Sequence, residues 1–136
     1  MLTNRSMPEC TVIPVLSYPD VTQAIDWLCH AFGFTLRLRI GDHRAQLAIG
    51  GGAIVITKER TALARTKGSV MVRVEDVHRH SVIAIGHGAH LISLPTDYPY
   101  GERQYTVEDI AGHSWTFSQT VSDSDPEEWG GSQMSM

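Results

Sequence analysis

The chain repeats one pattern twice, over about residues 12–58 and about residues 68–120. In each copy an apolar stretch ends in an Asp-Val pair, which begins at Asp20 in the first copy and at Asp76 in the second. A helix-length segment follows each pair, and a glycine of the kind that ends helices comes next, at Gly33 and at Gly88. A repeat unit of this length indicates a duplicated structural module rather than a solenoid of short units.

After the glycine, each copy continues with segments whose apolar residues alternate as they do in strands, and each closes with a tight glycine turn and a last strand. We therefore predict an α+β fold of two tandem βαβββ modules that form a cupped mixed sheet. The length of 136 residues, 42% of them hydrophobic, suits one continuous core. Residues 1–121 are predicted to form a single domain, and residues 122–136 are predicted to form a flexible acidic tail. Within this tail, we expect the Trp129 indole to be covered by a partner subunit or by the sheet edge.

Charge and composition argue against several classes of partner. The net charge of −4 and the scattered arginines argue against nucleic acid, because phosphate binding favours a basic stripe. No apolar run is long enough to span a bilayer, and the N-terminus lacks the apolar stretch of a signal peptide, so we expect a cytoplasmic protein. Cys10 and Cys29 are not spaced as a pair of metal ligands, and we expect both to be small apolar residues that pack in the interior.

Several segments resemble the vicinal-oxygen-chelate superfamily, which includes glyoxalase I, the bleomycin-resistance proteins and the extradiol dioxygenases. In the first module these segments are residues 14–20, 24–28 and 31–34. In the second they are residues 100–103 and 108–117. The resemblance covers residues 12–120 and implies homodimers in which modules from two chains complete each cleft. It identifies the fold better than the function, because this fold serves both binding proteins and several enzyme chemistries.

The resemblance also implies where a metal would bind, because metalloenzymes of this superfamily take one ligand from the first and last strand of each module. Counting from the aspartates and the turn glycines places these positions at Ile13, Ile56, Ser69 and Thr116. A shift of one residue gives Pro14, Val55, Val70 or Trp115, which are equally unsuitable. A divalent metal requires imidazole, thiolate or carboxylate ligands. We therefore predict a metal-free protein of the bleomycin-resistance type with no cofactor.

The histidines are interpreted as surface or turn residues, since His78 and His80 would point to different faces of one helix. The alternative is a relocated metal site, for which His43, His90, Glu102 and His113 would have to converge. That alternative corresponds to a metal-dependent lyase, isomerase or dioxygenase of the same superfamily. We expect no catalytic residues under the main hypothesis.

The lining of the cleft follows from the alternation of side chains along each strand. Residues of opposite parity, among them Val55, Trp115 and Phe117, are predicted to lie beneath the helices. The segment 95–105 is the candidate mouth, since it concentrates three tyrosines. The predicted ligand-binding residues are Ile13, Val15, Ser17, Ile54, Ile56, Ser69, Met71, Arg73, Tyr98, Tyr100, Arg103, Ser114 and Thr116.

Such a lining suits a bulky, partly aromatic small molecule held by area and a few polar contacts. The main hypothesis is therefore a protein that sequesters such a ligand, with an antibiotic as the leading candidate, for drug resistance or self-resistance. A third reading, beside the enzyme, is a ligand sensor or protein-interaction partner that uses Trp129 and the acidic tail.

Overall fold

The computed structural model describes residues 2–61 and 67–134. The first module consists of a strand, a helix and three further strands. These are β1 (Val15–Tyr18), α1 (Val21–Phe32), β2 (Thr35–Ile40), β3 (Arg44–Ile49) and β4 (Gly52–Lys58). The second module repeats this order with β5 (Ser69–Arg73), α2 (Val77–Gly86), β6 (His90–Asp97), β7 (Glu102–Glu108) and β8 (Ser114–Thr120). A short 3-10 helix, η2 (Pro126–Trp129), follows.

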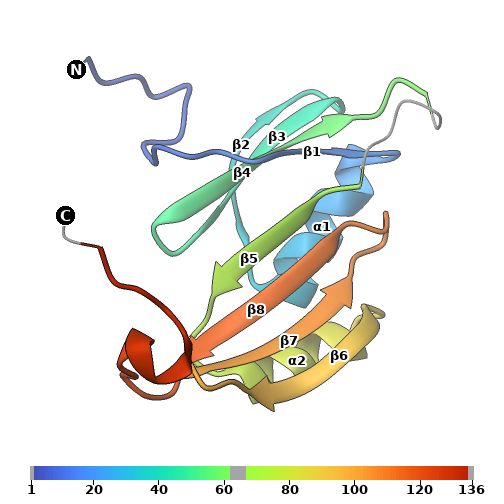
Figure 1. Ribbon diagram of the computed structural model, residues 1–136. Coiled ribbons are helices and arrows are strands. Elements are labelled where there is room, and N and C mark those ends of the chain that lie inside the picture. Colours follow the sequence, from blue (N-terminus) through green and yellow to red (C-terminus); the bar gives the residue numbers. More distant parts are fainter. Residues whose placement is uncertain (1, 62–66, 135–136) are drawn as a thin grey trace.

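Each module forms a four-stranded mixed sheet with the same topology, β1-β4-β3-β2 and β5-β8-β7-β6 (Figure 1). The first strand of each module lies at an edge and pairs in parallel with the last, whereas the other pairs are antiparallel. The predicted α+β fold of two βαβββ modules is confirmed.

The duplicated Asp-Val pairs mark the start of each helix. Asp20 and Asp76 are extended N-cap residues whose carboxylates accept hydrogen bonds from the backbone N–H of Gln23 and Arg79. Gly33 ends α1 in the left-handed conformation with φ of 79°. The end of α2 differs from expectation, because His87 is its C-cap and Gly88 follows one residue later.

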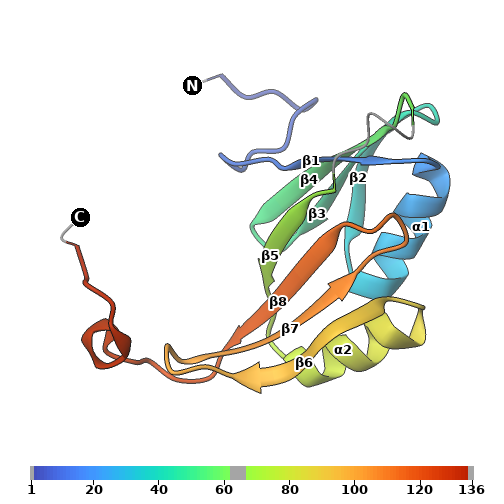
Figure 2. The same ribbon diagram turned by 45° about the vertical axis from the view of Figure 1, so that its right-hand side comes forward.

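Both helices lie on the same side of the molecule, against one face of each sheet (Figure 2). The core beneath them is continuous across the modules, since Phe32 of α1 packs against Trp115 and Phe117 of β8 at centroid distances of 5.4 and 4.8 Å. The prediction that these two β8 aromatics lie under the helices is confirmed. Cys10 and Cys29 are both free and partly buried, and Cys29 packs against the core.

A buried polar network joins the two modules. The Tyr18 hydroxyl of β1 donates to Asp109 Oδ2 at 2.5 Å, and the Trp115 indole N–H donates to the same oxygen at 2.9 Å. His113 accepts from the Gly68 N–H through Nδ1 and donates from Nε2 to the Ser17 carbonyl. His113 follows the turn that precedes β8, in keeping with its interpretation as a turn residue, but its side chain is fully buried and does not reach solvent.

A second set of contacts joins the helices. The Trp27 indole of α1 donates to the His87 carbonyl after α2, at 2.8 Å. His80 of α2 donates from Nε2 to the Phe32 carbonyl at 3.0 Å, and its Nδ1 accepts from the Tyr105 hydroxyl. His80 is therefore partly buried and packed, not a surface residue. Sequence spacing missed this role because the partners lie in another module or a distant strand.

A candidate ligand groove along β5

The face of the second sheet that points away from the helices is open. Val70 and Val72 of β5 pack against the core, so Ser69, Met71 and Arg73 point to the opposite side. Met71 is 63% exposed. The register places Ser114, Thr116 and Ser118 of β8 beside these three residues, as the alternation predicted. The role of this face in binding a ligand stays a prediction.

The first sheet agrees with the prediction in β1 but not in β4. Val15 is 59% exposed on the open side and Ile13 and Ser17 are half-buried, whereas Ile54 and Ile56 lie in the core beneath α1. The register pairs Val15 with Val55, so Val55 is the residue on the open side. The prediction was wrong by one residue because Ala53 to Ile56 are all buried, and a strand buried on both faces shows no alternation.

The chain's own N-terminal arm, residues 5–8, is held at the open side of the first sheet. Arg37 Nη2 donates to the carbonyls of Arg5 and Met7 at 3.1 and 3.0 Å. Gln46 Nε2 donates to the Ser6 carbonyl at 2.8 Å, and Pro8 is buried. Gln46 is itself only 3% exposed. The two sheets therefore differ: the arm occupies one open face, while the other remains accessible.

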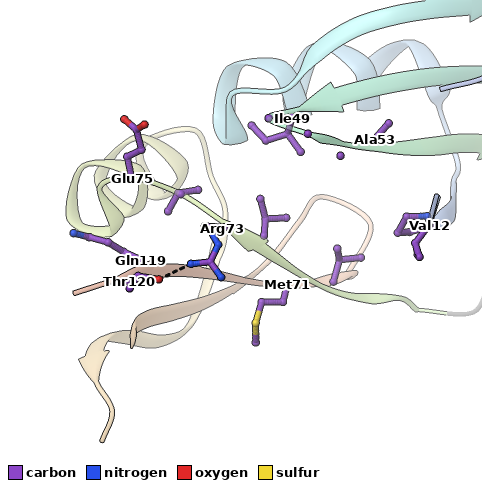
Figure 3. Close-up of a pocket in the computed structure, with 15 residues that line it drawn as sticks. Val12, Ile49, Ala53, Met71, Arg73, Glu75, Gln119 and Thr120 are labelled. Atoms are coloured by element: carbon purple, nitrogen blue, oxygen red, sulfur yellow. Dashed lines mark hydrogen bonds between the residues drawn. The ribbon is translucent and has the colours of Figure 1, made fainter. Parts of the chain in front are cut away.

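A cavity of about 770 Å³ lies between the β3–β4 turn of the first sheet and the β5 edge of the second. Figure 3 shows Ile49 and Ala53 on one side of it and Met71 and Arg73 on the other. Most of its lining is apolar or glycine. The lining residues are Val12, Pro14, Ile49, Gly50, Gly51, Gly52, Ala53, Val70, Met71, Val72, Arg73, Val74, Glu75, Gln119 and Thr120.

A second cavity of about 650 Å³ lies over the open face of the second sheet. It is lined by Met71, Arg73, Tyr100, Glu102, Gln104, Ser118 and Trp129. Since Met71 and Arg73 line both cavities, the two adjoin, and we refer to them together as the β5 groove. Of the thirteen predicted ligand-binding residues, the groove brings together Met71, Arg73 and Tyr100.

Three charged side chains line the β5 groove, namely Arg73, Glu75 and Glu102. Glu102 Oε1 accepts from the Ser118 hydroxyl at 2.7 Å and lies 3.9 Å from Arg73 Nη1. Arg73 also donates to the Thr120 hydroxyl (Figure 3). Hydrogen bonds from Thr120 and Ser118, and then the charge of Arg73, hold the pKa of the Glu102 carboxyl below its usual range. Glu102 is therefore ionised at neutral pH.

The segment predicted as the mouth divides between groove and core. Tyr98 and Tyr100 are stacked with centroids 5.4 Å apart, and Trp129 of the tail meets Tyr100 edge-on at 5.5 Å. Tyr105 is fully buried under α2. The sequence could predict only that Trp129 would be partly covered, from the size and apolarity of its side chain. Nothing in its local sequence specifies Tyr100 as its neighbour.

Arg103 does not reach the groove. Its guanidinium pairs with Asp97 at 2.6 Å, and its β8 neighbour Gln119 accepts the Val77 N–H at the start of α2. Arg103 thus lies on the helix side, opposite to Glu102 and Gln104. The sequence did not reveal this orientation, because adjacent strand residues point to opposite faces and the loop gave no fixed register. A role of Arg103 in ligand binding stays a prediction.

The positions at which this fold would hold a metal carry no suitable donors. The register makes Val55 the counterpart of Thr116, because these residues pair with Val15 and Met71, which stand at equivalent positions in the two modules. The set is then Ile13, Val55, Ser69 and Thr116, which offers only alkyl and hydroxyl groups. Within residues 2–61 and 67–134, no three histidine, cysteine or acidic side chains cluster as a metal site would require.

Residues 11–117 match the family described as the Glyoxalase/Bleomycin resistance protein/Dioxygenase superfamily. Among solved structures, TioX from Micromonospora sp. ML1 is 34% identical, with a TM-score of 0.74 over 82% of this chain and 99% of that one. A family enzyme from Burkholderia phytofirmans PsJN is 18% identical, with a TM-score of 0.69 over 80% and 97%. The lactoylglutathione lyase from Agrobacterium tumefaciens is 14% identical, with a TM-score of 0.65 over 90% and 98%.

The last two likenesses concern the fold alone. No curated protein matches the chain. None of the helices in the described part of the chain is long and apolar enough to cross a membrane.

Proposed function

We propose that this chain, which belongs to the glyoxalase/bleomycin resistance protein/dioxygenase superfamily, is a metal-free protein that sequesters a bulky, partly aromatic small molecule. The observation that carries the proposal is the β5 groove, which is open and largely apolar while the four metal positions of the fold lack donors. A groove that holds no metal ion can still bind a small molecule, because burial of the ligand's apolar surface and a few polar contacts supply the affinity.

The chemistry of the lining narrows the ligand. Met71 offers a flexible, polarisable surface that adapts to irregular shapes, and Tyr100 offers a rigid apolar face. Glu102 and Arg73 supply charges of opposite sign over the open face of the second sheet, and Glu75 adds a second carboxylate at the β5 edge. A ligand of several rings with a few polar substituents fits this combination.

The proposal also covers the ligand class, the cellular location and the oligomeric state. An antibiotic is the ligand class we favour, in keeping with the bleomycin-resistance members of the superfamily, and the protein would act in drug resistance or self-resistance. It would work in the cytoplasm as a homodimer with two equivalent clefts. The exposed apolar side chain of Val15, which lies on the open side of the first sheet and lines neither cavity, supports a partner subunit there.

Thermal unfolding of the metal-stripped protein against a panel of aromatic and peptide antibiotics tests the proposal. A ligand at 100 times its dissociation constant stabilises the folded state by about 2.7 kcal/mol. We expect such stabilisation without added metal, and its loss in Met71→Lys. The control Val82→Lys changes a side chain that is 72% exposed on α2, away from the groove. Stabilisation only in the presence of a divalent metal would contradict the proposal and favour a metalloenzyme.

A further inference from the structure

The C-terminal tail places an indole at the wall of the second cavity of the β5 groove. Asp125 caps η2 by accepting the Glu127 N–H, and Gly130 closes it in the left-handed conformation with φ of 95°. The Gly131 N–H then donates to the Pro126 carbonyl at 2.8 Å. This compact turn presents Trp129 to Tyr100, yet Trp129 remains 41% exposed. A large aromatic side chain that is fixed but half uncovered is available to a ligand.

The start of the tail is anchored to the β6–β7 turn. The backbone N–H groups of Val121 and Ser122 both donate to the Gly101 carbonyl. Gly101 has φ of 83°, and a Cβ atom there would lie 2.2 Å from the Ser122 carbonyl oxygen. Only glycine permits this close approach. The anchor fixes where the tail leaves β8, next to Tyr98 and Tyr100.

The floor beneath these aromatics is a chain of hydrogen bonds that runs in one direction. The Tyr100 hydroxyl donates to Gln104 Oε1 at 3.3 Å, and Gln104 Nε2 donates to the Ser118 hydroxyl at 3.0 Å. Ser118 in turn donates to Glu102 Oε1 at 2.7 Å. Both hydroxyl groups use their protons within this series of hydrogen bonds. The series ends on the Glu102 carboxylate, whose side chain is 18% exposed. Glu102 also accepts from Thr120 and lies 3.9 Å from the Arg73 guanidinium, but a carboxylate accepts several hydrogen bonds, so Glu102 can accept a further one from a ligand.

We infer that Trp129, Tyr100 and Met71 enclose a subsite for a planar aromatic ring that carries a hydrogen-bond donor, preferably a positively charged amine. The ring lies against the indole and the tyrosine, and the donor reaches Glu102. This inference rests on the proposed function, because it names the part of the ligand that the groove selects. The tail is then a wall of the binding site rather than an unrelated extension.

Isothermal titration with matched small probes tests the chemistry of the subsite. The probes are 2-naphthylmethylammonium, 2-naphthylacetate and cyclohexylmethylammonium, which vary the charge and the planarity separately. We expect the naphthyl cation to bind about tenfold more tightly than either of the others. Equal affinity for the three probes, a preference for the anion, or no binding of the naphthyl cation would overturn the inference.

Variants of the C-terminal tail test whether Trp129 forms a wall of the subsite. Trp129→Ala and a chain that ends after Ser124 should both bind the naphthyl cation about tenfold more weakly. A chain that ends after Gly131 keeps the indole and should bind as the full chain does. Unchanged binding after removal of residues 125–136 would also overturn the inference.

The charge partner is tested by Glu102→Gln, which should reduce the preference for the naphthyl cation over the naphthyl anion about tenfold. Thermal unfolding of each variant checks that it remains folded. The two proposals fail separately. If antibiotics stabilise the protein while the tail variants have no effect, only the subsite is wrong. If the probes bind as expected but no larger molecule does, the proposed function is wrong.

Discussion

Asp109 is the residue on which the junction of the modules depends most. Its carboxylate accepts from the Tyr18 hydroxyl, the Trp115 indole and the backbone N–H groups of Ala111 and His113. Burial, followed by the Asp109 charge, raises the pKa of Tyr18 well above its ordinary value. Tyr18 therefore remains a hydrogen-bond donor throughout the physiological pH range.

We predict that Asp109→Asn lowers the free energy of unfolding by about 2–3 kcal/mol, because an amide nitrogen would face groups that are already donors. Urea denaturation measures the change. The exposed tail residue Asp123 supplies the control, and Asp123→Asn should leave the stability nearly unchanged. Equal effects of the two substitutions would contradict the role given to Asp109.

His80 should make the stability depend on pH. Burial lowers its pKa, opposed by the hydrogen bond to the Phe32 carbonyl, so the folded state favours neutral imidazole. The unfolded chain takes up this proton at higher pH than the folded chain does. The stability that neutral His80 contributes is therefore present above the unfolded pKa of about 6.5 and is lost as the pH falls through the folded value.

We expect urea midpoints to fall between about pH 7.5 and about pH 5, and the fall to be smaller in His80→Gln. His78→Gln, on the exposed side of the same helix, is the control. A pH dependence that is identical in all three proteins would show that His80 is not responsible.

At the residue scale, the sequence predicted orientations wherever polar and apolar residues alternate. Ser69, Met71 and Arg73 alternate with valines, so their position on the open side could be predicted from the sequence. Ile54 and Ile56 stand in an unbroken apolar run, so no parity was visible there. The burial of His113 could not be foreseen, since it depends on contacts with Gly68 and Ser17, which are both distant from it in the sequence.

At the element scale, the helices and strands followed from the repeat, the capping aspartates and the glycine turns. The two terminal segments did not, because neither carries a periodic pattern. The N-terminal arm is held by Arg37 and Gln46 through backbone carbonyls of the arm, which any sequence would supply. The predicted mobility of residues 122–136 stays a prediction, although η2 and the contact of Trp129 with Tyr100 give part of this tail a defined place.

The arm can be tested by limited proteolysis under native conditions. Arg37→Ala removes the donors to the Arg5 and Met7 carbonyls, so trypsin should cleave after Arg5 about tenfold faster. Arg39→Ala is the matched control on the same strand, because Arg39 donates to Thr22 and Gly41 instead. Equal cleavage rates in the two variants would mean that Arg37 does not hold the arm.

At the scale of the whole molecule, duplication has produced two modules with one topology and different open faces. The first face carries the N-terminal arm, while the second faces the β5 groove and receives the C-terminal tail. The core, the Asp109 network and the helix contacts make the pair a single packed unit. The groove itself could be predicted only in part, since it also needs the β3–β4 turn and Trp129, which lie far from β5 in the sequence.

The most direct test of sequestration is recovery of a bound antibiotic from the metal-stripped protein. An antibiotic that stabilises the protein is incubated with it, the protein is then denatured, and the released molecule is identified by mass spectrometry. We predict one unchanged ligand per groove, whether or not divalent metal is added. Release of a chemically altered molecule that forms only with metal would contradict metal-free sequestration and identify the protein as an enzyme.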